Sequence, residues 1–347
     1  MILLMTNLPG DLTVTRLQAV LDSRGVESLI LSPETMAEHK VSLRIKGGGQ
    51  AVLCFDDRSM DVRDIRSAWL WRCWYAERDD PRLEHVASDR DDRAFFQREW
   101  VAFHKGLTTA LQYSNVFCLN PPPFNVAFEE KCCQLLLASQ VGLCIPDTLY
   151  TVRLDAAREF YDEHHEQIIY KPFKGHVVVQ GHDEAHVRVA LIYTNRVAGE
   201  RLVEGPNFIP TPCIFQPYIP KAIELRIVII DRSIFTCAIH SQQSERSRDD
   251  WRRYDLEHTP YTPYDLPEPI QQRLFALMDR LGLVYGSVDM ILTPAGEYVF
   301  LEINPNGQFD WVAQRAALPI YEQLADLLIN GPSAGRRVEP AEVPYVV

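Results

Sequence analysis

Residues 286–311, GSVDMILTPAGEYVFLEINPNGQFDW, form the stretch of sequence that decides the fold. Two runs rich in β-branched and aromatic residues, 287–292 and 298–303, predict two strands. The residues between them, TPAG at 293–296, have turn chemistry, because proline presets φ and glycine supplies a positive φ. The stretch therefore predicts a β-hairpin followed by a polar loop.

Three oxygen-bearing side chains lie on this predicted hairpin. Asp289 is on the first strand, and Glu302 and Asn304 stand two residues apart at the end of the second, so both project from the same face. Carboxylates among apolar neighbours are costly to bury without a charge partner. Mg²⁺ is a suitable partner, because it binds protein oxygens, keeps waters and takes its other ligands from nucleotide phosphates. An ordinary hairpin with polar residues is the better interpretation for Asp289 alone, but the three residues together favour a metal site.

The amino-acid sequence of this stretch is similar to that of a known protein family. DMIL followed by LEINPN resembles the metal-binding end of the ATP-grasp ligases, in which a strand Asp and a Glu-x-Asn pair hold the magnesium ions of ATP. The longer run LEINPNGQFDW is similar to one branch, the microviridin-type ligases that crosslink ribosomally made peptides (graspetides, or omega-ester-containing peptides). The resemblance covers residues 120–330 most strongly and implies ATP and Mg²⁺ as cofactors.

Length and composition limit the class of protein. The chain has 347 residues, enough for two or three domains, and its 46% hydrophobic and 24% charged residues are ordinary for a globular protein. A net charge of −12 argues against a general nucleic-acid binder. No apolar run is long enough to span a membrane, and the eight cysteines form no C-x-x-C pair. We expect a cytoplasmic protein with reduced cysteines and no nucleic-acid or membrane partner.

The N-terminal residues predict an α/β layer. An apolar strand at 2–6 is followed by a helix that Thr13 or Thr15 can cap, and then by a strand at 28–31. The predicted fold class is α/β (α+β), with the ATP-grasp fold that the resemblance implies. Its predicted parts are an N-terminal α/β domain (1–115), a central ATP lobe (120–215), a C-terminal metal-binding lobe (216–330) and a loose tail (331–347).

Two lysines are predicted to contact phosphate. Lys131 lies in a predicted helix at 126–141 and, from its position alone, is a solvated charge. The resemblance favours a phosphate contact, because many ATP-grasp enzymes carry such a lysine just before a G-x-x-x-P segment, matched here by Gly142 and Pro146. Lys171 ends an apolar strand, where a partly desolvated point charge suits a phosphate, and YKPF matches the second nucleotide lysine of the family. An edge lysine that reaches out to solvent is the alternative for Lys171.

The segment 213–219, CIFQPYI, corresponds to the hinge between the two ATP-grasp lobes. Backbone groups commonly bind adenine at this hinge, and Gln216, Tyr218 and Ile219 are the matching positions. Arg226 follows on the next strand and matches the arginine of a related Asp-Ile-Arg motif. It is predicted to contact substrate or phosphate, and a structural ion pair is an equally weighted alternative.

The polar run at 242–254, QQSERSRDDWRRY, is a solvated loop by composition. In many ATP-grasp ligases an arginine of the corresponding segment reaches the γ-phosphate, and Arg252 is the favoured match ahead of Arg253. The predicted catalytic residues are therefore Arg226, Arg252 and Lys171, and the predicted metal ligands are Asp289, Glu302 and Asn304.

The resemblance implies that MgATP phosphorylates a carboxylate and that a nucleophile then attacks the acyl phosphate. In the graspetide branch the carboxylate is an Asp or Glu side chain of a precursor peptide with a leader and a core. The nucleophile is a Thr or Ser hydroxyl or a Lys amine, which gives a macrolactone or a macrolactam. We expect an ATP-dependent ligase with this precursor as its partner, assembled as a homodimer.

Two other functions fit parts of the sequence. The alternative enzyme is a ligase of glutamate-ligase or glutathione-synthase type, which adds amino acids to a protein or small-molecule carboxylate. A nucleotide- and peptide-binding module without chemistry is a different class. The presence of both lysines and all three oxygen donors argues against such a module.

Overall fold

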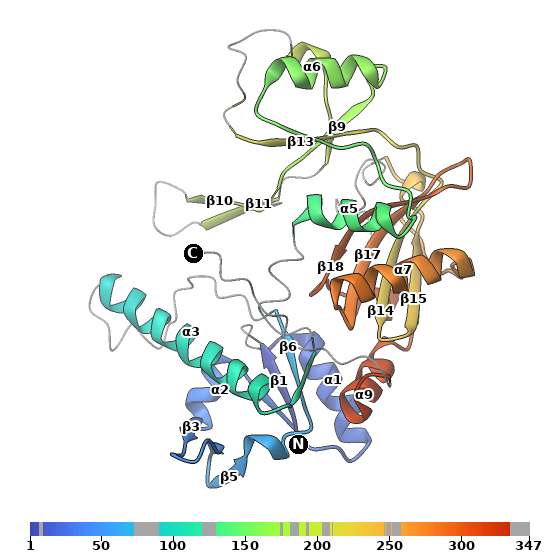
Figure 1. Cartoon of the computed structure of the whole chain (residues 1–347). Helices are drawn as coiled ribbons and strands as arrows, with labels where there is room; N and C mark the ends of the chain where they lie inside the picture. The colour runs from blue at the N-terminus through green and yellow to red at the C-terminus, as the bar shows by residue number, and fades with distance from the viewer. Residues whose placement is uncertain are drawn as a thin grey trace.

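The computed structural model describes most of the chain, in a mixed α/β fold of several sheets (Figure 1). The described residues are 1–6, 10–72, 90–119, 130–173, 176–180, 187–191, 194–202, 209, 211–245, 247, 251 and 258–333. Among them, no helix combines the length and the apolar character needed to cross a membrane.

The N-terminal part is a parallel sheet with helices. Its strands are β1 (Ile2–Thr6), β2 (Ser28–Leu31), β6 (Ser67–Trp71) and β7 (Phe117–Leu119), and its helices are α1 (Leu12–Ser23), α2 (Pro33–Glu38) and α3 (Arg90–Tyr113). The strands run parallel in the order β2-β1-β6-β7. Every residue of β1 and β6 is buried, as expected for parallel strands covered on both faces.

The cap of α1 differs from the prediction. Asp11, rather than Thr13 or Thr15, is the N-cap residue, and its carboxylate accepts from the backbone N–H of Thr13 at 2.8 Å. The second oxygen of Asp11 also accepts from the indole N–H of Trp71 at 3.1 Å. Asp is among the favoured N-cap residues, so the cap itself has a local signal in the sequence. The contact with Trp71 depends on the packing of the distant strand β6.

A small antiparallel sheet packs beside the first. It consists of β3 (Ser42–Ile45), β4 (Ala51–Phe55) and β5 (Arg58–Asp61), and the short helix η1 (Val62–Asp64) follows. Leu53 and Phe55 of β4 are buried in one core with Leu3 and Met5 of β1.

The sheet of the central part and its helix lie at the top of the view in Figure 1, above the N-terminal and C-terminal sheets. Its antiparallel sheet has the order β12-β9-β13-β8, with β8 (Leu149–Thr151), β9 (Ile168–Lys171), β12 (Asn195–Arg196) and β13 (Cys213–Pro217). The helix α6 (Leu154–Glu163) buries Leu154, Ala157 and Phe160 against this sheet. A separate hairpin of β10 (His176–Gln180) and β11 (Val187–Leu191) and the short helix η3 (Gly199–Leu202) complete it.

The C-terminal sheet is antiparallel and has five strands in the order β16-β15-β14-β17-β18. They are β14 (Ile223–Ile230), β15 (Ser233–Ile239), β16 (Tyr261–Pro263), β17 (Tyr285–Leu292) and β18 (Tyr298–Asn304), with the short helix η4 (Ser241–Gln243) after β15. The predicted hairpin is therefore present as β17 and β18. It pairs residue by residue, with a register shift between Asp289 and Met290.

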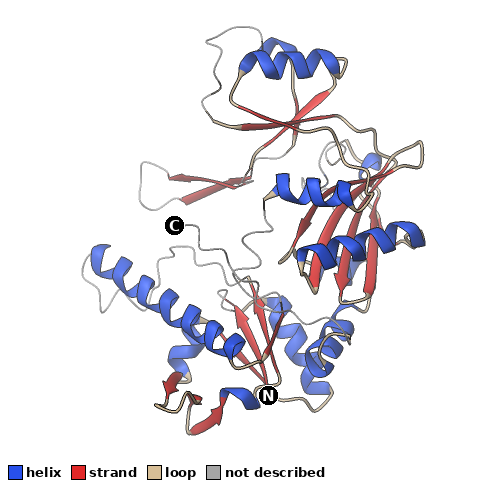
Figure 2. Cartoon of the chain, in the orientation of Figure 1, coloured by secondary structure: helices blue, strands red, loops and turns tan. Residues whose placement is uncertain are grey.

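Helices pack against both faces of the C-terminal sheet, and Figure 2 shows one of them crossing in front of its strands. On one face, α5 (Lys131–Gln140) and α7 (Glu268–Leu281) share a core with Leu225, Ile227 and Phe300. On the other face, α8 (Asp310–Arg315) and α9 (Ile320–Asn330) join the sheet to the N-terminal strands in a single core. The C-terminal and N-terminal sheets are thus held together, while the division of the chain at 115, 215 and 330 stays a prediction.

Candidate functional site

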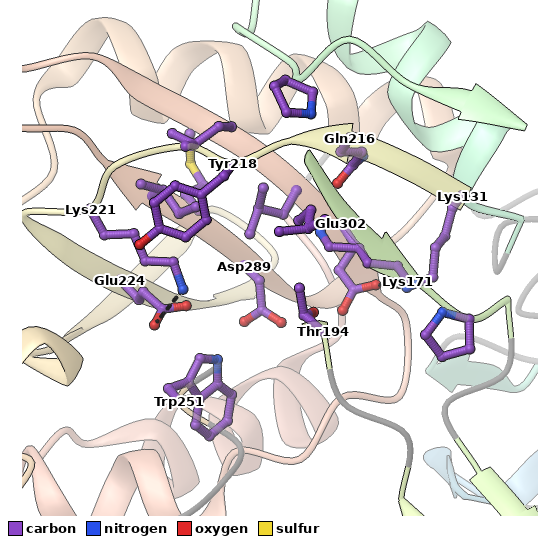
Figure 3. A pocket seen from close by; sticks show the side chains of 17 residues that line it. Lys131, Lys171, Thr194, Gln216, Tyr218, Lys221, Glu224, Trp251, Asp289 and Glu302 are labelled. Carbon is purple, nitrogen blue, oxygen red and sulfur yellow. Dashed lines mark hydrogen bonds and ion pairs between the residues drawn. The ribbon is translucent and has the colours of Figure 1, made fainter. Parts of the chain in front are cut away.

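A cleft lies between the central sheet and the C-terminal sheet (Figure 3). The space between its walls is about 930 Å³, part of it open to solvent. Its lining includes the predicted residues Lys131, Lys171, Gln216, Tyr218, Ile219, Asp289 and Glu302. Segments that are distant in the sequence therefore meet at one site.

Two carboxylates lie on the C-terminal wall of the cleft. Asp289 of β17 and Glu302 of β18 are direct cross-strand partners, so their Cβ atoms point to the same face about 5 Å apart. Like charges in this arrangement destabilise a sheet unless a cation compensates for them. In the structure each carboxylate has its own cation: Arg226 contacts Asp289, and Lys131 contacts Glu302.

Arg226 reaches Asp289 because of the strand register. On β14, Leu225 and Ile227 face the core beneath α7, so Arg226 projects from the opposite face, directly across from Asp289 on β17. The Arg226 Nη1 atom lies 3.0 Å from Asp289 Oδ1, and both side chains are largely buried. Burial alone lowers the pKa of this guanidinium, but the Asp289 carboxylate outweighs burial and the pKa is raised. The ion pair that was the structural alternative for Arg226 is therefore present.

Arg226 also fixes the loop after β18. Its Nη2 atom donates to the carbonyl oxygen of Gln308 at 3.0 Å. The backbone of Gly307 comes so close that an added Cβ would lie 2.7 Å from Arg226 Nη2 and 2.5 Å from the Ser287 Cβ. Only glycine allows this approach. Among the described residues, the lining of the cleft includes Asp289 and not Arg226, so the substrate or phosphate contact of Arg226 stays a prediction.

Lys131 lies at the first turn of α5 and forms an ion pair with Glu302. Each side chain is about a quarter exposed, at 28% and 27%, so both remain accessible from the cleft. Lys171 ends β9 on the opposite, central wall and also lines the cleft. Figure 3 shows Lys131, Lys171 and Glu302 grouped on one side, with Asp289 between them and Glu224.

The hinge residues form another part of the lining. Gln216 is 4% exposed and its side-chain N–H donates to the Thr148 hydroxyl at 2.9 Å. The ring of Tyr218 stacks against the guanidinium of Arg196, 3.6 Å from the ring centroid, a contact that favours a fixed ring orientation. Ile219 adds an apolar surface to the same side.

Two predicted site residues, Asn304 and Arg252, are not among the described residues that line the cleft. Asn304 is exposed at the end of β18, opposite Ser287, and its side-chain oxygen accepts from the backbone N–H of Asn306 at 2.9 Å. Arg252 lies outside the described residues. The metal role of Asn304 and the phosphate role of Arg252 stay predictions.

The donor set fits a magnesium nucleotide. The described residues contain no group of three His, Cys, Asp or Glu side chains arranged to hold a metal by themselves. Asp289 and Glu302 offer two carboxylates, and Mg²⁺ typically uses one or two carboxylates together with phosphates and water. The lysines on both walls supply positive charge for phosphate oxygens. The residues present therefore suit Mg²⁺ that arrives with a nucleotide.

Sequence reasoning missed an ion pair in the cleft. Lys221 Nζ lies 3.1 Å from Glu224 Oε1, and each side chain is only 7% exposed. Glu224 also accepts from the Ser241 hydroxyl at 2.7 Å. In the sequence, this ion pair is indicated by the i, i+3 spacing of Lys221 and Glu224 directly after the hinge. Trp251, which is 8% exposed and also lines the cleft, had no such signal because it lies in a polar run.

We compared the chain with known protein families, curated proteins and solved structures. No protein-family model and no curated protein matches the chain significantly. The macrocyclase MdnC of Microcystis aeruginosa MRC, solved with the precursor peptide MdnA, is 27% identical with a TM-score of 0.77, over 95% of this chain and 99% of that one. A RiPP-associated ATP-grasp ligase of Chryseobacterium gregarium, solved with ADP and a leader and core peptide, is 25% identical with a TM-score of 0.81, over 94% and 96%.

The ATP-grasp ligase PsnB, solved with a minimal precursor, Mg and ADP, has a TM-score of 0.70 over 94% of this chain and 97% of that one. At 20% identity this likeness establishes the shared fold alone. Together, the similar structures confirm the predicted ATP-grasp fold over nearly the whole chain.

Proposed function

We propose that this chain, an ATP-grasp ligase of the graspetide maturase kind, uses MgATP to crosslink a ribosomally made precursor peptide. Carboxylate side chains of the peptide are joined to its own hydroxyl or amine groups. The observation that carries the proposal is the cleft in which Lys131, Lys171, Asp289 and Glu302 meet below the hinge. The likeness to ligases solved with ADP and with precursor peptides supports it.

The chemistry begins with activation of a carboxylate, which is a poor electrophile. A carboxylate oxygen of the peptide attacks the γ-phosphorus of ATP, the bond to the β-phosphate oxygen breaks and ADP leaves. A hydroxyl or amine of the peptide then attacks the acyl phosphate, loses its proton and displaces inorganic phosphate. The net change in the peptide is the loss of one water for each ring.

The residues of the chain act mainly by electrostatics and by positioning. Lys131 and Lys171 neutralise phosphate oxygens from the two walls of the cleft. The hinge residues Gln216, Tyr218 and Ile219 hold the adenine. Asp289 and Glu302 hold Mg²⁺, with Asn304 as a further oxygen donor, and the metal supplies charge stabilisation for the transferred phosphoryl group.

Two arginines complete the proposed site. Arg252 contacts the γ-phosphate. Arg226, which is fixed by Asp289 and Gln308, contributes positive charge beside the metal carboxylates. A leader segment holds the precursor on the enzyme, and a core segment carries the reacting side chains.

The test is a mass measurement on the precursor peptide. The product of a short open reading frame beside the gene is incubated with the enzyme, ATP and Mg²⁺. We expect the loss of a whole number of waters, reversed by mild base if the links are esters and kept if they are amides. We expect esters. A gain in mass equal to an added amino acid would reject crosslinking and favour the carboxylate–amine ligase.

We also propose that the enzyme is a cytoplasmic homodimer. The cysteines within the described residues are all free, which is consistent with a reducing compartment. Light scattering coupled to size-exclusion chromatography tests the assembly, and a monomeric mass at working concentration would reject the dimer.

A further inference from the structure

The outer edge of β18 is closed by a side chain from α5. The side-chain N–H of Gln134 donates to the carbonyl oxygen of Ile303 at 2.8 Å, and the side-chain oxygen of Gln134 accepts from the backbone N–H of Ile303 at 2.9 Å. Gln134 is 2% exposed. Its planar amide therefore replaces a neighbouring strand for one residue of the edge, where unpaired buried backbone groups would be costly.

Ile303 separates two of the predicted metal ligands, Glu302 and Asn304. The N–H of Ile303 lies in the peptide plane between Glu302 and Ile303. The carbonyl group of Ile303 lies in the peptide plane between Ile303 and Asn304. Gln134 binds both groups and so fixes both planes. The side chain of Ile303 is 2% exposed in the core on the opposite face. Backbone and side chain together set the direction in which Glu302 projects into the cleft.

The same helix supplies Lys131. Lys131 lies three residues before Gln134 and therefore on the same face of α5. Its ammonium pairs with the Glu302 carboxylate, next to the backbone groups that Gln134 holds. Leu135 and Ala138 anchor the helix in the core beneath the sheet. The helix thus contacts the end of β18 through one charged pair and one pair of neutral hydrogen bonds.

We propose that Gln134 is a positioning residue for the metal and phosphate site. It touches neither ligand and acts through the backbone of Ile303. By fixing the planes on both sides of Ile303, it orients Glu302 and Asn304 for Mg²⁺. The inference rests on the proposed function for the nucleotide and the metal, and extends it to a residue outside the lining of the cleft.

The direct test compares Gln134→Met with Gln140→Met. Gln140 is an exposed residue of the same type in the same helix, so its substitution controls for changes in helix stability. ADP affinity is measured by calorimetry without metal and across a Mg²⁺ titration. For Gln134→Met we expect the apparent Mg²⁺ affinity to fall roughly 10- to 100-fold, as for other outer-shell partners of metal ligands. The metal-free ADP affinity stays near that of the wild type.

Hydrogen exchange on the metal-free protein gives a second readout. The Ile303 amide should lose protection in Gln134→Met and keep it in Gln140→Met. Gln134→Glu retains the length and the acceptor for the Ile303 N–H but lacks the donor. We expect this variant to fold, to keep Ile303 protected and to show a smaller loss of Mg²⁺ affinity.

The outcomes separate this inference from the proposed function. A wild-type protein that binds no ADP, with or without Mg²⁺, would reject the proposed function itself. If the wild type shows Mg²⁺-dependent ADP binding and Gln134→Met shows the same dependence, only the role of Gln134 is overturned. A lower Tm without a change in metal dependence overturns it as well. If Gln134→Met does not fold, an unchanged Mg²⁺ affinity in Gln134→Glu is the result that rejects it.

Discussion

Thr148 fixes the orientation of the Gln216 amide. The Thr148 hydroxyl donates to the carbonyl oxygen of Pro146 at 3.0 Å, and it lies 2.9 Å from Gln216 Nε2. A hydroxyl has a single hydrogen, so Thr148 can only accept from Gln216. The network therefore assigns the NH₂ group of Gln216 to Thr148. Under the proposed function, the side-chain carbonyl oxygen of Gln216 would then be the acceptor on the side of the adenine.

The first prediction concerns this anchor. Thr148→Val keeps the shape of the side chain but removes the acceptor, so the Gln216 amide loses its fixed orientation. We expect ADP affinity to fall roughly two- to tenfold, the range for one lost hydrogen bond. Calorimetry measures the change, and Thr148→Ser, which keeps the hydroxyl, should bind ADP like the wild type. Unchanged affinity in Thr148→Val would show that the anchor is not needed.

The second prediction concerns Glu302. Glu302→Gln preserves the shape and removes a metal ligand and a negative charge, so the chain should fold normally. Mg²⁺-dependent ATP turnover should fall roughly 100- to 1,000-fold. Release of ADP across a Mg²⁺ titration gives the measurement. Glu297→Gln, at an exposed position in the turn of the same hairpin, is the matched control. Near wild-type turnover in Glu302→Gln, with metal bound normally, would remove Glu302 from the site.

The third prediction concerns Lys171, the lysine of the central wall. Lys171→Ala should weaken ATP binding roughly tenfold or more, because it removes a charged partner of a phosphate. Phosphoryl transfer should slow in single-turnover experiments, and Lys171→Arg should recover part of the affinity. If affinity and single-turnover rate both hold in Lys171→Ala, the phosphate role is wrong.

The fourth prediction concerns stability against pH. His104 of α3 is 2% exposed, and burial lowers the pKa of its imidazole to about 4. Its usual pKa is about 6.5, so between these values the unfolded chain binds a proton that the folded chain does not. The stabilisation is present above about pH 6.5 and is lost as the pH falls toward 4.

We therefore expect the wild type to lose stability on the order of 2 kcal/mol between about pH 7 and pH 5 through this residue. Chemical denaturation at the two pH values measures the loss. The asparagine side chain of His104→Asn does not titrate in this range. The loss of stability between the two pH values should therefore be about 2 kcal/mol smaller in His104→Asn than in the wild type. Equal losses in the two proteins would contradict the assignment.

Local sequence patterns predicted much of the site. The hairpin of β17 and β18 follows from its turn chemistry and its apolar runs, and its strands bring Asp289 and Glu302 together as expected. The apolar residues of α7 recur at helical spacing in the sequence, and the helix buries five of them, Ile270, Leu274, Leu277, Met278 and Leu281. Such features depend on residues close together in the chain, so periodicity reveals them.

Other features depend on long-range contacts. Gln134 looks like an ordinary polar residue of a helix, and its burial follows only from the packing of α5 along the edge of β18. The ion pair of Arg226 with Asp289 spans 63 residues and requires the register of β14 and β17. A single sequence carries no signal for these registers, so neither contact could be assigned before the structure.

The central claim is that each crosslink consumes one ATP. The most direct measurement follows one reaction of enzyme, MgATP and precursor peptide, with ADP determined enzymatically and the peptide mass recorded at the same times. We expect one ADP for every water lost, and neither product when the peptide or Mg²⁺ is omitted. Water loss without ADP, or steady ADP release while the peptide mass stays unchanged, would contradict it.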